Sequence, residues 1–194
     1  NVFSRGLTPE MWEDLLSQPA HPLNNKAAGG LYPPGSTFKM VTAMAALELG
    51  IVNRNKTFFC PGHYKLGDTK FHCWKAGGHG HVNVIDALAQ SCDTYFYNVA
   101  VDIGVDRLAE YSRKLGFGQI LGIELTEERP GLIPTREWKR SYMGQPWHPG
   151  ESIVASIGQG YTQVTPLQLA VMTARLANGG NAVKPGLAEY VGQK

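Results

Sequence analysis

Glycine and proline divide this chain into short segments, and this division constrains its fold more than any other feature. The 194 residues include 23 glycines and 12 prolines, and alternating runs of valine, isoleucine and threonine are few. A large sheet is therefore not expected, and the apolar segments between the breaks are typical of helices. We predict helices at Thr8 to about Leu16, Ser36–Leu49, Val84–Gln90, Thr94–Ile103, Asp106–Leu115 and Thr165–Ala177, with long connections at 72–81 and 130–160.

The composition limits the classes of partner. Hydrophobic residues make up 43% of the chain, enough for one core, so we expect one domain or one lobe of a larger domain. The formal net charge is +2 and no cluster of lysine and arginine is present, which argues against a nucleic-acid or polybasic membrane surface. No apolar run approaches the roughly 20 residues of a membrane span and no signal-peptide pattern opens the chain, so any membrane anchor is expected outside it.

A proline-rich turn precedes a serine and a lysine on one predicted helical face. Pro33, Pro34 and Gly35 force a turn, and a helix then opens on Ser36. The free N–H groups of a helix N-terminus favour a developing oxyanion, which suits a serine nucleophile. Lys39 lies three residues on, and among apolar neighbours its amine could accept the serine proton. Ordinary helix capping by Ser36, with an exposed lysine, is the alternative.

A second serine element, Ser91-Cys92-Asp93, falls between two predicted helices. Its hydroxyl and carboxylate are candidates for the same site as Ser36 and Lys39. In isolation the element is a helix cap, with Asp93 or Thr94 capping the following helix.

The cysteines form a candidate metal site. The chain has three cysteines, so complete internal disulfide pairing is impossible. Together with one histidine they would provide the four ligands of a structural Cys3His zinc site: Cys60, Cys73, His79 and Cys92. His81, His72 or His63 could replace His79. A Cys60–Cys73 disulfide with Cys92 as a buried thiol is the alternative.

The two serine motifs, with several further segments, resemble class B penicillin-binding proteins of the elongation type. These segments are 30–39, 93–97, 115–118, 134–138 followed by Pro146-Trp147, and 157–161. The resemblance implies an α/β fold shared with serine β-lactamases. The family's third motif, K-[ST]-G on a strand of the cleft, is absent, because Lys184-Pro185-Gly186 offers neither the hydroxyl nor the strand N–H. We therefore expect residues 1–194 to be a partial transpeptidase domain, a mainly helical lobe that lacks most of the central antiparallel sheet.

The same resemblance implies a peptidoglycan D,D-transpeptidase that cross-links stem peptides during cell-wall elongation without a catalytic cofactor. Ser36 would attack the D-Ala-D-Ala end of a stem peptide and form an acyl-enzyme, and β-lactams would acylate the same serine. Lys39 and Ser91 would move protons, while Asp93 would orient the lysine or the substrate. The parent protein is expected at the periplasmic face of the bacterial inner membrane, held by a single-span anchor beside a polytopic glycosyltransferase and other elongation proteins.

Other functions stay open at this level. A D-Ala-D-Ala carboxypeptidase or β-lactamase would share S-x-x-K, and Glu124, Glu127 and Glu128 are the nearby loop candidates for a deacylating base. The missing third motif favours a non-catalytic scaffold with a vestigial serine. Gly158 and Gly160 are expected to allow a close backbone approach at the active-site floor or to form a plain turn.

Overall fold

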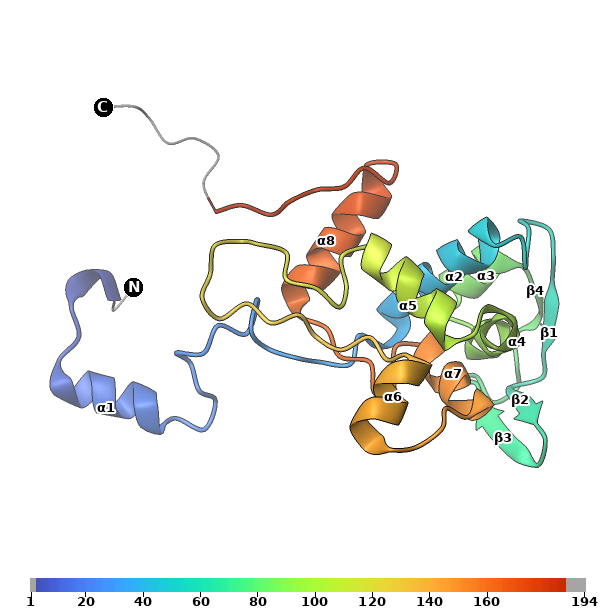
Figure 1. The fold of residues 1–194 in the computed structure, drawn as a ribbon, viewed down its shortest axis with the longest axis horizontal. Helices are drawn as coiled ribbons and strands as arrows, with labels where there is room; N and C mark the ends of the chain where they lie inside the picture. Colours follow the sequence, from blue (N-terminus) through green and yellow to red (C-terminus); the bar gives the residue numbers. More distant parts are fainter. Residues whose placement is uncertain (1–2, 188–194) are drawn as a thin grey trace.

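The computed structural model describes residues 3–187, which form a helical body with two small two-stranded sheets at one end (Figure 1). Its helical elements are η1 (Phe3–Arg5), α1 (Pro9–Ser17), η2 (Gly35–Phe38), α2 (Lys39–Glu48), α3 (Val84–Ala89), α4 (Asp93–Ile103), α5 (Val105–Lys114), α6 (Arg136–Met143), α7 (Pro149–Ser156) and α8 (Pro166–Ala177). Its strands are β1 (Phe58–Cys60), β2 (His63–Leu66), β3 (Thr69–His72) and β4 (Gly80–Val82).

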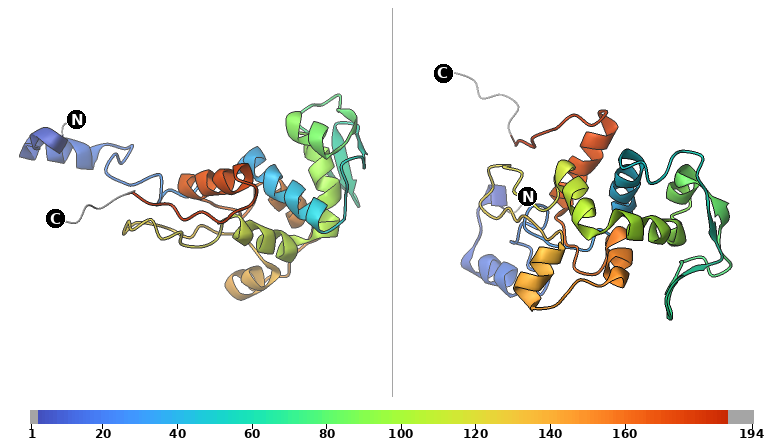
Figure 2. Two further views of the ribbon diagram at one scale, coloured as in Figure 1. Left: turned by 90° about the horizontal axis from the view of Figure 1, so that it is seen from above. Right: turned by 45° about the vertical axis from the view of Figure 1, so that its right-hand side comes forward.

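Helix α4 lies at the centre of the body, and the two views of Figure 2 place its neighbours around it. It packs against α2, α3, α5 and α7 and against the first three strands. Tyr95, Phe96 and Val99 are fully buried on different sides of this helix. A helix that is apolar on several sides is stable only inside a core, so the sequence of α4 fixes its central position.

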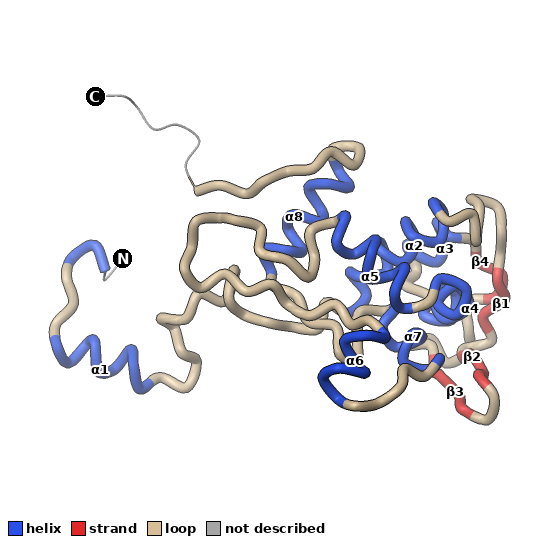
Figure 3. Tube along the Cα trace, viewed as in Figure 1, coloured by secondary structure: helices blue, strands red, loops and turns tan. Residues whose placement is uncertain are grey.

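The strands form two antiparallel ribbons, drawn in red in Figure 3. Strand β1 pairs with β4, with Cys60 opposite Gly80, and β2 pairs with β3, with Leu66 opposite Thr69. Within residues 3–187 the named strands form only these two-stranded sheets. The predicted mainly helical character of the chain is confirmed.

The caps explain where several predicted helices begin. Thr8 caps α1 by accepting a hydrogen bond from the Met11 N–H, and Thr165 and Gln168 form the expected capping box of α8. The helix predicted to begin at Asp106 is α5, which begins one residue earlier, at Val105. The N-cap is Gly104 at a φ of 72°, and the Asp106 carboxylate accepts a hydrogen bond from the Arg136 backbone.

The predicted long connection at 130–160 is also wrong, because it contains α6 and α7. Thr135 caps α6 by accepting from the Trp138 N–H, and α7 begins with Pro149. These two helices bring the segment 157–161 beneath the serine at the start of α2.

Helix α1 lies apart from the body, at the left of Figure 1, where the described part of the chain both begins and ends. None of its residues is buried. Among the described helices, none is both long and apolar enough to cross a membrane.

Candidate active site

Ser36 is held in a one-turn 3-10 helix that runs directly into α2. Gly35 has a φ of 56°, and its N–H donates to the Gly158 carbonyl at 3.0 Å. The Thr37 hydroxyl donates to the Pro34 carbonyl at 2.6 Å, which closes the turn. Ser36 is exposed, so the predicted presentation of its hydroxyl at the start of a helix is the geometry that the structure has.

Lys39 is buried beneath this serine and is the centre of the site. Its side chain is 2% exposed, and its Nζ lies 2.5 Å from Asp93 Oδ1 in an ion pair. The same Nζ donates to Ser91 Oγ and to the Ser91 carbonyl, both at 2.9 Å. The alternative of an exposed first-turn lysine is wrong, because the ammonium lies inside the fold with three oxygen partners.

The Ser91 hydroxyl connects the lysine to the outer serine. Ser91 Oγ donates to Ser36 Oγ at 3.0 Å, so a continuous hydrogen-bonded series runs from Ser36 through Ser91 to Lys39 and Asp93. The four residues that the sequence suggested as catalytic are thus in mutual contact, and Ser91 lies between the serine and the lysine.

The connection between α3 and α4 holds Ser91 and Asp93 in place. Ser91 has a φ of 52°, and its N–H donates to the Leu88 carbonyl. The prediction that Asp93 caps the following helix is wrong: Cys92 is the N-cap residue, and Asp93 is the first residue of α4. There its negative charge meets the positive end of the helix dipole.

Trp74 also contacts the site, and no sequence pattern indicated this. Its backbone N–H donates to Asp93 Oδ2 at 2.9 Å, which leaves both carboxylate oxygens of Asp93 with partners. Its indole N–H donates to the carbonyls of Gln90 and Ser91. The side chain is otherwise exposed and forms one rim of the pocket.

The pocket at Ser36, called the catalytic pocket for its candidate role, is open and has a volume of about 530 Å³. It is lined by Ser36, His72, Cys73, Trp74, Ser91, Asp93, Tyr97, Ile157 and Gln159.

Gly158 forms the floor under the serine turn. A Cβ atom at this position would lie 2.5 Å from the Gly35 carbonyl oxygen and 2.6 Å from Phe38 Cβ. Its φ of 70° also favours glycine. The expected close backbone approach is confirmed here, whereas a Cβ at Gly160 would meet only the Val154 side chain.

Lys184, Pro185 and Gly186 lie in the irregular segment after α8, outside any strand. Lys184 lines a pocket with Arg175 and residues 119–121, away from Ser36. The Lys184-Pro185-Gly186 segment therefore does not form a K-[ST]-G strand beside the catalytic pocket.

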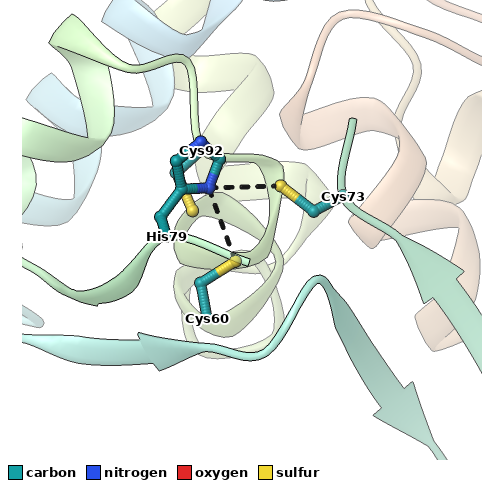
Figure 4. Close-up of side chains that lie close together, drawn as sticks. All are labelled: Cys60, Cys73, His79 and Cys92. Atoms are coloured by element: carbon teal, nitrogen blue, oxygen red, sulfur yellow. Dashed lines mark hydrogen bonds between the residues drawn. The ribbon is translucent and has the colours of Figure 1, made fainter. Parts of the chain in front are cut away.

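The four candidate metal ligands also meet, as Figure 4 shows. Their ligand atoms all lie within 4.8 Å of one another, and the three cysteines are buried and free of disulfides. The structure selects His79 over the other histidines: its Nδ1 lies 3.6 Å from both Cys60 Sγ and Cys73 Sγ.

The two nitrogen–sulfur distances allow a comparison with a metal site. Tetrahedral zinc with ordinary zinc–sulfur and zinc–nitrogen bonds would place a histidine nitrogen about 3.6 Å from each sulfur. Two of the ligands adjoin catalytic-pocket residues, since Cys73 precedes Trp74 and Cys92 lies between Ser91 and Asp93. An interaction that fixes the positions of the cysteines would therefore also restrain Trp74, Ser91 and Asp93.

The thiols differ in acidity. Burial would raise the pKa of Cys60, but hydrogen bonds involving Thr94, His79 and the Gly62 backbone lower it to about 6. Burial raises the pKa of Cys92 to about 12, and the nearby Cys60 and Cys73 sulfurs contribute to the increase. A bound cation would favour the thiolate form of all three.

The fold and the serine–lysine network define the class of protein. The penicillin binding protein transpeptidase domain matches residues 5–193, and the chain belongs to this family. One curated relative, the peptidoglycan D,D-transpeptidase MrdA of Escherichia coli (strain K12), is 43% identical over 189 residues, which cover 96% of this chain and 30% of the relative. The resemblance inferred from the motifs is thus confirmed.

Solved structures agree with this assignment. PBP2 of Pseudomonas aeruginosa, in complex with WCK 5153, is similar with a TM-score of 0.91 and 43% identity, covering 95% of this chain and 41% of that one. PBP2 of Helicobacter pylori, in complex with MreC, has a TM-score of 0.90 and 34% identity, and the match covers 97% of this chain and 36% of that one. The chain spans about 30% of the length of the curated relatives that it matches.

Proposed function

We propose that this chain carries the nucleophilic half of a peptidoglycan D,D-transpeptidase, with Ser36 as the nucleophile. The hydrogen-bonded series from exposed Ser36 through Ser91 to the buried Lys39–Asp93 pair carries the proposal. It links a solvent-accessible hydroxyl to a lysine by way of one intervening hydroxyl, which is the arrangement needed to remove a proton during attack.

In the first half-reaction, Ser36 Oγ attacks the carbonyl carbon of the penultimate D-Ala and forms an ester. Lys39 must first release its ammonium proton to solvent; the Ser36 proton then passes to Ser91 Oγ as Ser91 gives its own proton to the neutral amine of Lys39. The bond to the terminal D-Ala nitrogen then breaks, and the same route run in reverse protonates this leaving amine. Asp93 keeps Lys39 within reach of Ser91 throughout.

In the second half-reaction, an amine of a neighbouring stem peptide attacks the ester carbon and displaces Ser36 Oγ. The incoming amine loses a proton, and the serine oxygen regains one through Ser91 and Lys39. A β-lactam follows the first half-reaction alone, because its opened ring remains attached and blocks the amine.

The K-[ST]-G strand would supply a second oxyanion donor and groups for the substrate carboxylate. The 194 residues contain no such motif. We therefore propose that residues 1–194 form a partial transpeptidase domain, and that the first half-reaction in this chain is slow compared with a longer form carrying the strand.

Intact-mass spectrometry after incubation with a fluorescent penicillin tests the proposal. One adduct per chain is expected, on Ser36, faster in the longer form and absent from Ser36→Ala in both. A folded longer form that gains no adduct would refute the proposal and support the scaffold alternative.

The lifetime of the adduct separates a transpeptidase from a β-lactamase. Of the glutamates considered as deacylating bases, Glu128 accepts three backbone N–H groups from residues 121–123, and Glu127 accepts from the Asn25 N–H. None of the three candidate glutamates lines the catalytic pocket. We therefore expect the adduct to persist for many minutes, and rapid release of hydrolysed penicillin would instead favour a β-lactamase.

We further propose that Cys60, Cys73, His79 and Cys92 bind one structural zinc ion, which acts outside the chemistry of the serine. The 3.6 Å nitrogen–sulfur distances support this ligand set. Metal analysis of chain purified without added zinc should give close to one zinc per chain. His79→Ala should lose the metal, while the matched variant His81→Ala should retain it. Substoichiometric zinc together with a Cys60–Cys73 disulfide would refute the site.

Stem peptides and β-lactams are the proposed small ligands, and elongation proteins the proposed partners of the parent protein. The Helicobacter pylori relative was solved with MreC, and another relative in a peptidoglycan synthase complex. We propose that the parent protein works at the periplasmic face of the inner membrane through a single-span anchor. Fractionation of cells that express the full-length protein, with and without its predicted anchor, tests this placement.

A further inference from the structure

A second pocket lies between the β2–β3 hairpin and α7, at the end of the molecule opposite α1 (Figure 1). Its volume is about 470 Å³, within the usual range of small-molecule sites. Its walls are apolar and aromatic, formed by Leu66, Phe71, Trp147, Val154, Ala155 and Tyr161. We call it the hairpin pocket.

The hairpin pocket adjoins the catalytic pocket along three segments of the chain. In each segment, a residue that lines the hairpin pocket is one or two sequence positions from a residue that lines the catalytic pocket. The segments are β3, the end of α7 and the loop after α7. These pairs are Phe71 and His72, Ala155 and Ile157, and Gly160 and Gln159. The two pockets therefore share these three stretches of backbone in their walls.

The register of the hairpin explains the apolar wall. Leu66 pairs with Thr69 and Tyr64 with Phe71, so alternation places these four side chains on one face of the ribbon. The Phe71 ring lies 6.0 Å from the ring of Tyr97, which lines the catalytic pocket. Phe71 and Tyr97 thus form an aromatic pair that contributes one ring to the wall of each pocket.

The charge of the lining indicates what the hairpin pocket can hold. Glu151 is its carboxylate, and both oxygens are engaged: Oε1 lies 2.5 Å from Lys139 Nζ, and Oε2 accepts from the His148 N–H at 2.7 Å. The Lys139 side chain is only 2% exposed, so this pair is an internal one. A charged ligand group would find no unpaired counter-charge in Glu151, whereas an apolar group would bury surface against three aromatic rings.

We propose that the hairpin pocket is a binding subsite for an uncharged apolar or aromatic group of a ligand whose reactive end reaches Ser36. The connection to Ser36 rests on the proposed function, but binding to the subsite does not. Such a group could belong to the acyl donor, including the side chain of a β-lactam, or to the acceptor amine.

Gly150 allows the pocket to be filled without changing the catalytic residues. A Cβ atom at this position would lie 3.2 Å from Phe71 Cζ, so a longer side chain enters the pocket against that ring. Gly150 is the second residue of α7, and its φ is outside the left-handed region, so other residues suit its backbone. Gly150→Leu is the filling variant, and Gly150→Ala is its matched control.

Binding is tested by nitrogen–proton NMR titration of the chain with phenylacetamide, phenylacetate and phenethylammonium. Phenylacetamide should bind in the millimolar range, with shifts centred on the Trp147 indole and the Tyr161 amide, and the two charged probes should bind more weakly. Gly150→Leu should weaken phenylacetamide about tenfold or more and Gly150→Ala much less. Equal affinity in the leucine variant, or equal binding of the charged probes, would overturn the subsite.

The connection to Ser36 is tested by two rate ratios in wild type and Gly150→Leu. The donor arm compares acylation by benzylpenicillin with acylation by the acetamido analogue, and the acceptor arm compares aminolysis of the adduct by phenylalaninamide and by glycinamide. If the donor ratio is about tenfold lower in Gly150→Leu than in wild type, the group belongs to the acyl donor; if the acceptor ratio is, the group belongs to the acceptor amine. Unchanged ratios in both arms overturn the connection. If neither the wild-type chain nor its longer form is acylated, the proposed function fails, while the titration still decides the subsite.

Discussion

Replacing Asp93 with asparagine should destabilise the chain, because the substitution leaves the Lys39 ammonium buried without a counter-charge. The two side chains are 2% and 12% exposed, and the ion pair is 2.5 Å long. Removing one partner of a buried pair costs about 3–5 kcal/mol. For a chain of this length, that loss lowers Tm by roughly 6–20 °C.

A double-mutant cycle separates this pairing from other effects of substitution. Lys39→Met should also destabilise, since it leaves the Asp93 carboxylate buried with only the Trp74 N–H as a named donor. In Lys39→Met/Asp93→Asn neither charge remains, so the combined loss should fall short of the sum by about 1–3 kcal/mol. Urea unfolding followed by circular dichroism gives all three values.

The exposed ion pair between Lys114 and Glu110 provides the matched control, because its side chains are 52% and 62% exposed. Glu110→Gln should leave the unfolding midpoint nearly unchanged. If Asp93→Asn behaves in the same way, or if the two losses in the cycle add to within about 0.5 kcal/mol, the buried-pair reasoning is refuted.

Three further variants test neighbouring parts of the site. Burial raises the pKa of Glu151, but the hydrogen bond from Lys139 lowers it below 4.5. The native state should therefore lose stability as pH falls below 4.5. In Lys139→Met, the decrease of Tm between pH 6 and pH 3 should be smaller than in wild type. Gly158→Ala should cost about 1–3 kcal/mol for its left-handed backbone alone and should slow acylation by displacing the serine turn, whereas an unchanged Tm would contradict the close approach. Trp74→Phe keeps a ring at the rim but loses the hydrogen bond to the Ser91 carbonyl, so penicillin labelling should slow with a stability loss near 1 kcal/mol, and full labelling speed would exclude a positioning role.

The sequence predicted the members of the candidate active site better than it predicted their connections. Ser36 and Lys39 share a helical face, so local geometry alone places them together. Ser91 and Asp93 come more than fifty residues later, and only the family motif indicated that they meet the first pair. That Ser91 lies between Ser36 and Lys39 depends on long-range packing of α4 against α2, which no local pattern encodes.

The missed helices α6 and α7 had local signals that the density of glycine and proline obscured. Thr135 precedes α6 as a cap, and Pro149 with Glu151 marks the start of α7. Trp74, unlike these helices, had no local sequence signal. Its role depends on its backbone N–H reaching Asp93 across the fold, and no sequence pattern predicts such a contact.

The backbone conformation of Ser91 is energetically unfavourable. A φ of 52° is unfavourable by about 1–2 kcal/mol for most residues other than glycine, and Lys39 contacts both the carbonyl and the hydroxyl of this residue. Glycine at this position would relax the backbone and remove the hydroxyl. The hydrogen bond from the buried Lys39 ammonium to this hydroxyl opposes that gain, so the unfavourable backbone of Ser91 is offset by the contact that its side chain makes.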